Sequence, residues 1–464
     1  MDANSTWCTA VKGTGTLAIT ATPNTETRVR TATVTLTAGS VTSVTITVTQ
    51  AAASETGETG PFNFSITGYE GQIITVTFDG NATEDVTLSA NGNGKLTNSQ
   101  TPRTIKSIKL KATGGKDILI GRKEDSGNII LSVDNSTHAV KWRTKTDNNA
   151  TALIGTAAEL LLKFNAPTAV TTYEFEADID LMDQQWEPVA TLSKNIDGKG
   201  HKIYNLNMTL DFGGATTSGS AYGGLFRKYS GTLSNLHIAS GTISSTGISA
   251  VNAGGVAAFT GLLESSGQII GCSNTAKVTG NMNVAGICAR VGNTNSKIIA
   301  CANYGKITAT DSSGAGGICY YFNSGSITAC YNTGEISASY VGSHRYAGGI
   351  AARFSDNTTI SASYNTGTII PTGDSPEKET GAINGSNSGD NTIAESYYSA
   401  SSSTYGAGAT STTTTGTAKE FSSANWPEST DSNWGTGDGT NGNYWKNIGS
   451  WNAGTPTYPT LYWE

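Results

Sequence analysis

Polar and apolar residues alternate at every second position in two segments near the N-terminus. Residues 31–37 read TATVTLT, and residues 44–49 read VTITVT. A period of two is typical of half-buried strands, because successive side chains of a strand point to opposite faces. Turn-forming residues separate the two segments at 38–40. Residues 1–52 are therefore predicted to form a small β-sandwich-like domain.

Three further strand-like runs follow a polar, glycine-containing linker at 51–61. They read QIITVTF at 72–78, IKSIKLK at 105–111 and NIILSV at 128–133. Their β-branched and aliphatic residues favour strands over helices. A second small β-domain, of no assigned family, is predicted over 62–147.

One segment carries a helix signal. Thr156 precedes Glu159 by three residues, which is the spacing of a capping box. Leu160, Leu161 and Phe164 would then share one apolar face. We expect a short amphipathic helix that covers the open end of the repeats that follow.

The C-terminal half of the chain is built from repeats of similar length. A small residue, a glycine and an aliphatic residue recur, and the middle position lies at 224, 255, 286, 317, 349 and, in a decayed copy, 382. The steps are 31, 31, 31, 32 and 33 positions. Each unit contains two or three short strand-like runs and no helical face. This pattern is typical of one coil of a parallel β-helix.

A second signature runs in phase with the first. A cysteine or serine is followed two residues later by an asparagine, in the pairs Cys272/Asn274, Cys301/Asn303, Cys330/Asn332 and Ser363/Asn365. Leu206 and Leu236 are predicted to occupy the cysteine position in earlier coils. Stacked asparagines would satisfy one another along the rod. We expect buried, reduced cysteines, with a Cys288–Cys319 bridge as the alternative.

The predicted fold class is therefore all-β. A single-stranded right-handed parallel β-helix with an N-terminal helical cap occupies 151–400, and small β-sandwich-like domains precede it. Residues 401–464 form the remaining predicted segment. It combines a loosely ordered Ser/Thr/Gly-rich tail at 401–425 with an aromatic C-terminal cap.

Two parts of the chain resemble known families. GTLAIT at 15–20, Asn24, the run from Arg28 to Val34 and ITVTQ at 46–50 resemble the second half of a BACON domain, a Bacteroidetes-associated carbohydrate-binding module. The first strands of such a domain are missing, which predicts a truncated N-terminus. The resemblance implies carbohydrate binding or a spacer role.

The repeats resemble the GLUG motif. The match begins with EADIDL at 176–181 and WEPV at 186–189, and continues with IDGKGHKI at 196–203 and GGLF at 223–226. It departs from the motif after Gly224-Leu225, where Phe226 follows. The resemblance implies surface adhesins or parts of large secreted proteins. Some IgA-cleaving peptidases carry the motif outside their catalytic domain, so it transfers no catalytic residue.

The charge and hydropathy of the chain limit the classes of partner and the cellular location that can be expected. Charged residues make up 14% of the chain, the net charge is −7, and the sequence shows no basic stripe. Nucleic acid is therefore excluded as a partner, because phosphate binding needs clustered Lys and Arg. No run reaches the roughly 18 apolar residues of a membrane span, and no signal peptide is visible. The expected location is extracellular, at a bacterial cell surface, as a lipoprotein whose outer-membrane anchor lies outside this chain.

No catalytic residue, metal site or cofactor is predicted. Asp178, Asp180 and Asp197 are candidates by type for the paired acids of a glycosidase, but turn capping is the favoured interpretation. The acids of the repeats do not recur in register, and no C-x-x-C pair or calcium loop is present. The histidines, at 138, 201, 237 and 344, are far apart in the sequence.

Aromatic residues near the C-terminus are the candidate ligand-binding set. They are Trp426, Trp434, Tyr444, Trp445 and Trp451. Their rings would either stack on sugars or pack against the last coil of the rod. The favoured function is cell-surface adhesion or glycan display without catalysis, with host or dietary glycans or extracellular matrix proteins as partners. A carbohydrate-active enzyme on a β-helix scaffold and a passive structural stalk are the alternatives.

Overall fold

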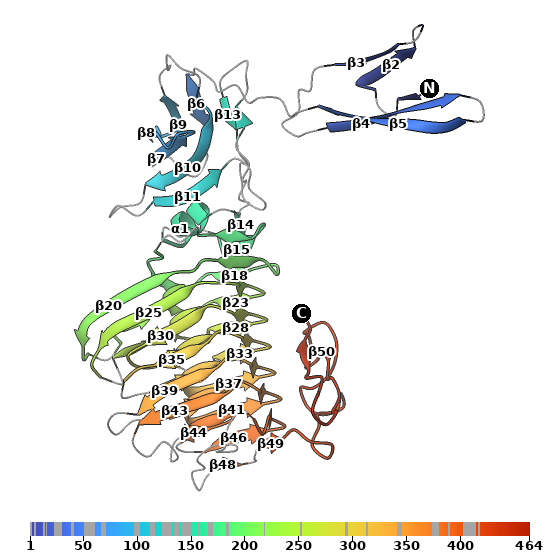
Figure 1. The fold of residues 1–464 in the computed structure, drawn as a ribbon. Helices are drawn as coiled ribbons and strands as arrows, with labels where there is room; N and C mark the ends of the chain where they lie inside the picture. The colour runs from blue at the N-terminus through green and yellow to red at the C-terminus, as the bar shows by residue number, and fades with distance from the viewer. Residues whose placement is uncertain are drawn as a thin grey trace.

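The structure is a computed structural model, and Figure 1 shows small N-terminal sheets, a short helix and a long column of stacked strands with the C-terminal segment beside it. The described residues are 2–3, 6–12, 14, 16–22, 30–38, 41–50, 61–65, 71–96, 103–111, 117–122, 132–133, 139–141, 151–155, 157–165, 170–181, 185–217, 219–250, 253–292, 296–311, 314–340, 346–373, 380–387, 390–401, 414–415 and 418–464. Within these ranges, no helix is long and apolar enough to cross a membrane.

The N-terminal segment forms two small antiparallel sheets. One contains β1 (Asp2–Ala3), β4 (Arg30–Ala38) and β5 (Val41–Gln50), and the other contains β2 (Cys8–Lys12) and β3 (Leu17–Ala21). Ala32 and Val34 are buried on one face of β4, as the alternating pattern predicts. Together with Cys8 they form a small core.

Two four-stranded sheets follow. The first joins β11 (Asp117–Arg122), β10 (Ile105–Lys111), β7 (Ile73–Phe78) and β8 (Thr83–Thr87) in antiparallel order. The second joins β12 (Ser132–Val133), β13 (Ala139–Lys141), β6 (Phe62–Ser65) and β9 (Asn93–Leu96), with β13 parallel to β6. Phe62, Phe78 and Ile108 are buried in the core of this region.

Helix α1 (Ala157–Asn165) begins close to the predicted position. Its Glu159 carboxylate accepts a hydrogen bond from the backbone N–H of Gly155 at 2.8 Å, which satisfies a donor just before the first turn. Leu160 and Phe164 are buried, and the Phe164 ring lies 5.3 Å from the rings of both Tyr173 and Phe226. The apolar face of the helix therefore packs on the first coils of the column.

The column is a parallel β-solenoid of about six coils, so the predicted β-helix is confirmed. Its 15-stranded sheet contains β14 (Thr151–Ile154), β15 (Thr172–Phe175), β17 (Val189–Leu192), β18 (Asn195–Asp197), β22 (Phe226–Tyr229), β23 (Thr232–Ser234), β27 (Thr260–Leu263), β28 (Gln268–Ile270), β32 (Cys288–Val291), β33 (Lys297–Ile299), β37 (Cys319–Thr328), β41 (Ala351–Ser361), β45 (Asn384–Asn387), β46 (Asn391–Ala394) and β48 (Thr414–Thr415).

Three smaller sheets complete the coils. The nine-stranded sheet contains β16 (Ile179–Asp180), β19 (Lys202–Tyr204), β24 (His237–Ile238), β29 (Ser273–Asn274), β34 (Ala302–Asn303), β38 (Tyr331–Asn332), β42 (Tyr364–Asn365), β47 (Tyr397–Tyr398) and β49 (Lys419–Glu420). One six-stranded sheet contains β20 (Met208–Ala215), β25 (Thr242–Ile248), β30 (Lys277–Gly280), β35 (Ile307–Ala309), β39 (Ile336–Tyr340) and β43 (Ile369–Gly373). The other contains β21 (Ala221–Gly223), β26 (Gly254–Val256), β31 (Val284–Ala285), β36 (Gly314–Gly316), β40 (Tyr346–Gly348) and β44 (Thr380–Gly381).

Each coil stacks its residues on their counterparts in the next coil. Cys288 pairs with Cys319 and Cys319 with Ala351, and both steps match those read from the repeats. The aliphatic residues after the glycines, such as Ile287, Ile318 and Ile350, are completely buried. All six cysteines are buried and free.

The early coils depart from the predicted register. Tyr222 pairs with Gly255, although the repeat pattern aligns Gly224 with Gly255. At this pair, the offset of two residues keeps the side chains on their own face of the strand, whereas an offset of one would reverse inside and outside. The next coil is offset by three residues, because Val256 pairs with Val284 and not with Ile287. Leu236 shares the cysteine position as predicted, because its neighbour His237 pairs with Ser273. Leu206 does not, since Lys202 already pairs with His237.

A buried asparagine ladder links four coils. Asn274, Asn303, Asn332 and Asn365 pair in register and have no exposed surface. The side-chain amides of Asn274, Asn303 and Asn332 each donate to the carboxamide oxygen of the asparagine in the next coil, at 2.9, 2.7 and 2.8 Å. All four amides also donate to a backbone carbonyl two residues later, at 2.9 to 3.0 Å. The buried amides are thereby satisfied by the stacking itself.

Replacing Asn332 with alanine should destabilise the column by about 2–4 kcal/mol, because it removes several buried hydrogen bonds and leaves their partners unsatisfied. Thermal and urea unfolding followed by circular dichroism would measure the loss. Asn452→Ala, at an exposed tail position, is the matched control and should change stability by less than about 0.5 kcal/mol. Equal effects from the two variants would show that the ladder contributes nothing specific.

Candidate functional site

One line of residues runs along the outer face of the nine-stranded sheet. We call it the outer ladder, and its members pair in register from coil to coil: Lys202, His237, Ser273, Ala302, Tyr331, Tyr364, Tyr397 and Lys419. In the strands of this sheet from β19 to β42, the next residue is buried and points inward, because side chains alternate along a strand. The outer ladder is therefore polar from Lys202 to Ser273 and aromatic from Tyr331 to Tyr397, and it ends at Lys419.

The C-terminal segment covers most of this ladder. It runs back along the column from the last coil, as the red segment of Figure 1 shows. Near the last coil, the Trp434 indole N–H donates to the Glu395 carbonyl at 2.8 Å. Several coils earlier, the Trp463 indole N–H donates to the Ala300 carbonyl at 2.8 Å, and the Tyr462 hydroxyl donates to Asn235 Oδ1 at 3.1 Å.

The predicted aromatic set divides into two groups. Trp434 and Trp445 have no exposed surface, and their rings stack with centroids 4.4 Å apart. Neither ring has a face available to a sugar in this structure. Trp426, Tyr444 and Trp451 are half-buried and pack against the same cluster. If the predicted aromatic set contacts a ligand directly, these three residues must make the contact.

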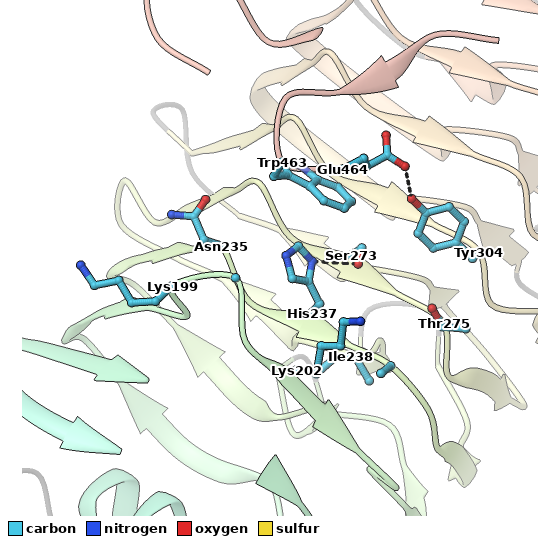
Figure 2. Close-up of a pocket in the computed structure, with 12 residues that line it drawn as sticks. Lys199, Lys202, Asn235, His237, Ile238, Ser273, Thr275, Tyr304, Trp463 and Glu464 are labelled. Carbon is cyan, nitrogen blue, oxygen red and sulfur yellow. Dashed lines mark hydrogen bonds between the residues drawn. The ribbon is translucent and has the colours of Figure 1, made fainter. Parts of the chain in front are cut away.

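A pocket of about 580 Å³ opens where the C-terminal segment ends on the outer ladder. We call it the side pocket. Figure 2 shows His237 and Ser273 at its centre, with Trp463 and Glu464 above them, Tyr304 to the right, Lys199 and Asn235 to the left and Lys202 below. Its volume lies within the range of small-ligand sites.

The base of the side pocket contains a histidine–serine contact. His237 Nδ1 lies 2.9 Å from Ser273 Oγ, and the Trp463 ring lies 4.6 Å from the imidazole ring. Burial, together with the nearby Lys202 ammonium, lowers the pKa of His237 to about 4, and Asp178 only partly opposes this shift. The imidazole is therefore neutral at neutral pH.

Glu464 holds the opposite wall in place. Its Oε1 accepts hydrogen bonds from the hydroxyls of Tyr304 at 2.7 Å and Tyr331 at 2.5 Å. Burial raises the pKa of both phenols, so both remain donors at neutral pH. The Lys446 ammonium donates to the Glu464 carbonyl at 2.6 Å. This carboxylate is thus engaged by the protein and anchors the end of the segment.

The two lysines of the side pocket differ in the ion pairs that they form. Lys199 lies 2.9 Å from Asp197 and 3.4 Å from Glu174. Lys202 is exposed and forms no ion pair with any residue that the structure describes. Lys202 can therefore offer its ammonium to a ligand without breaking an internal contact.

The three candidate acids are each engaged in local hydrogen bonds. Asp178 accepts from the backbone N–H of Lys202 at 3.0 Å and lies 3.1 Å from His201 Nδ1. Asp180 accepts from Asn205 Nδ2 at 2.8 Å. Burial would raise the pKa of Asp197, but hydrogen bonds, chiefly from Lys199, outweigh it and lower that pKa.

The other residues considered as metal ligands or catalytic groups form no metal site in the part of the chain that the structure describes. No three His, Cys, Asp or Glu side chains gather in that part to hold an ion. His138 and His344 lie outside the described residues, as does most of the predicted loose tail at 401–425. The side pocket was not predicted from the sequence, and Trp463 was not among the five aromatic residues of the candidate ligand-binding set. Positions 202, 237 and 273 share one register and line the side pocket, so their alignment could have indicated it. The irregular lengths of the early coils concealed that alignment in the sequence.

Comparisons with known proteins give a family match and several similar solved structures. Residues 2–51 match the BACON family model, described as "Putative binding domain, N-terminal". No curated protein matches the chain. One similar solved structure is a "putative immunoglobulin A1 protease" from Bacteroides ovatus, at 19% identity and a TM-score of 0.46, covering 69% of this chain and 94% of that one. Another is an "IgA1 Protease", at 11% identity and a TM-score of 0.32, covering 78% of this chain and 29% of that one.

These names contradict one prediction. The chain was expected not to be an enzyme, whereas both solved structures are named as proteases, which are enzymes. The error has a physical origin, since repeats report on the scaffold, while catalytic groups are single residues placed on it. At such identities and TM-scores the likeness assigns no catalytic residue to this chain.

The stability of the protein should fall as the pH drops from about 6.5 to about 4, the window set by His237. In that window the unfolded chain binds a proton at this position and the folded chain does not, so folding loses up to about 3 kcal/mol. Lys199, Lys202, Asp178 and Glu464 are the charged groups around the ring. Thermal unfolding of the parent and of His237→Gln across this range would test the prediction, with the variant showing the shallower decline. Superimposable pH profiles would contradict it.

Proposed function

We propose that the chain is a secreted bacterial surface protein that binds carbohydrate in the side pocket. The observation that carries the proposal is one pocket of about 580 Å³ that combines the half-buried Trp463 indole with the exposed polar side chains of Lys202 and Thr275. Sugars present CH-rich faces that pack on aromatic rings and hydroxyls that exchange hydrogen bonds with polar groups. A site of this composition suits a short oligosaccharide.

Two features of the chain support this function. The BACON family that matches residues 2–51 carries the description "Putative binding domain, N-terminal". The repeats resemble the GLUG motif, which implies display and adhesion at a cell surface. The proposal therefore includes an extracellular location with an outer-membrane anchor, and host or dietary glycans or extracellular matrix proteins as partners.

The half-buried aromatic residues of the C-terminal segment form a second contact surface in this proposal. Trp426, Tyr444 and Trp451 keep partly exposed rings. Trp434 and Trp445 would support them from behind as a buried stacked pair. A ligand longer than the side pocket could extend along the segment toward these rings.

A glycan array probed with the purified chain should identify bound oligosaccharides, and titration calorimetry should then give their affinity. Lys202→Ala combined with Thr275→Ala should weaken binding by about tenfold or more, because both side chains line the pocket and are exposed. Trp463→Ala should weaken it further, although this ring also anchors the C-terminal segment.

Two controls separate the candidate surfaces. Lys277→Ala removes an exposed lysine outside the pocket and should leave affinity unchanged. Trp451→Ala alters the half-buried aromatic surface of the C-terminal segment and leaves the pocket lining intact. Loss of binding in Trp451→Ala alone would show that the glycan binds to this aromatic surface and not in the side pocket. An array with no bound glycan would favour the passive stalk.

One contact favours a second function, hydrolysis of an ester or amide. Ser273 Oγ and His237 Nδ1 lie within hydrogen-bonding distance in an accessible pocket, which is the relation of a nucleophile to its base. Ser273 Oγ would attack the carbonyl carbon, and its proton would pass to His237 Nδ1 and then to the leaving group. Water would hydrolyse the acyl-serine. The low pKa of His237 makes it a weak base for this step.

Labelling with a fluorophosphonate probe tests the second function directly. We expect mass spectrometry to locate the label at Ser273 if the pair is reactive, and Ser273→Ala to abolish labelling. Glycan binding should survive this variant, because the substitution removes only a hydroxyl at the base of the pocket. An unlabelled protein that still binds glycan would dismiss hydrolysis and retain the binding function.

A further inference from the structure

A second line of side chains crosses the 15-stranded sheet on its outer face. We call it the cation ladder, and its members pair in register: Lys228 with Leu262, Leu262 with Arg290, Arg290 with Tyr321, and Tyr321 with Arg353. All five side chains are partly exposed. Their strand neighbours, such as Tyr229, Val291 and Phe322, are buried in the core.

The charges of this ladder are regularly spaced. Lys228, Arg290 and Arg353 occupy every second coil, and an apolar or aromatic residue lies between each pair. Adjacent strands are about 4.8 Å apart, so successive cations are about 10 Å apart along the rod. These residues are 62 and 63 positions apart in the sequence, and for that reason the sequence shows no basic stripe.

Aromatic rings hold the two guanidinium groups. The Arg290 and Arg353 guanidinium carbons lie 5.1 and 5.0 Å from the centre of the Tyr321 ring, and Arg353 also lies 5.4 Å from that of Tyr346. The Tyr321 hydroxyl is in turn 3.2 Å from Ser355 Oγ. A guanidinium that stacks on a ring directs the N–H groups of its edges away from that ring, in a geometry that suits carboxylate or sulfate.

A hollow of about 420 Å³ lies beside the ladder. Tyr222, Leu262, Arg290 and Tyr321 line it, together with Glu264. The Glu264 carboxylate lies 3.5 Å from the Lys228 ammonium and offsets part of that charge. Among the side chains that the structure describes here, the three cations therefore outnumber the one carboxylate, on a chain whose net charge is −7.

We propose that the cation ladder binds an acidic linear polysaccharide lying along the rod axis, with an anionic group on every second sugar. An extended sugar residue is close in length to the spacing between strands, so alternate sugars would meet alternate coils. The aromatic and aliphatic residues between the cations would contact the uncharged sugars. This site shares no residue with the side pocket and does not depend on it.

A nucleic acid fits the ladder less well. Its phosphates carry a charge on every unit, whereas the ladder offers a cation only at every second coil. The net negative charge of the chain would also oppose a dense polyanion. Single-stranded DNA is therefore the comparison ligand for the experiment.

Biolayer interferometry with immobilised hyaluronan oligosaccharides, which carry a carboxylate on every second sugar, tests the proposal. The parent chain should bind, and its affinity should rise with oligosaccharide length until three carboxylates are present. Added salt should weaken binding, because the contacts are ionic and partly exposed. Neutral dextran should not bind. Absence of hyaluronan binding, or equal binding to dextran or to single-stranded DNA, would overturn the proposal.

Charge-matched variants locate the site. Arg290→Gln with Arg353→Gln should reduce hyaluronan affinity by about tenfold or more. Lys277→Gln with Lys306→Gln removes the same charge from exposed positions outside the ladder and should change affinity by less than about twofold. Lys202→Ala with Thr275→Ala, which tests the side pocket, should bind hyaluronan like the parent. Equal losses of hyaluronan affinity in the two charge-matched variants would overturn the proposal. If the arginine variant unfolds, the dependence of the parent chain's affinity on oligosaccharide length still tests it.

Discussion

The vertical stacking of each residue on its counterpart in the next coil is the constraint on which the rest of the structure depends. Parallel pairing makes every position of a coil part of a line that runs along the rod. Inward lines become the aliphatic and cysteine core and the asparagine ladder. Outward lines become surfaces, namely the outer ladder and the cation ladder. The contribution of each residue therefore depends on its counterpart one coil away.

The repeats could be predicted from the sequence because their signal is periodic and shared by several copies. Glycine, an aliphatic residue and the Cys-x-Asn pair recur where the coils are most alike, and there the observed pairing of Cys288 with Cys319 follows the predicted step. Prediction failed where coils differ in length. The coil from Phe226 to its partner Thr260 is longer than the regular step, and the coil from Thr260 to its partner Cys288 is shorter. These two unequal coils together span the length of two regular ones, so the average period concealed the shift.

The candidate sites were harder to predict for a different reason. A cluster of tryptophans in sequence does not reveal which rings face solvent, and Trp434 and Trp445 lie inside the contact between the C-terminal segment and the rod. The side pocket joins Trp463 to His237, which lie in distant parts of the sequence. Such a contact depends on where a chain segment docks, and docking is a tertiary property that neither local propensity nor repeat period encodes. The BACON match and the solenoid, by contrast, rest on local patterns and were both predicted.

The course of the C-terminal segment changes how the rod can come apart. In an open stack, each coil touches only its neighbours, and the end coil can peel away alone. Here the segment leaves the last coil and is fastened again at Asn235 and Ala300, several coils earlier. Separating the last coil would first require detaching the C-terminal segment from the coils that it covers. A pulling force applied to the last coil would thus have to break these distant contacts before the coils could separate one by one.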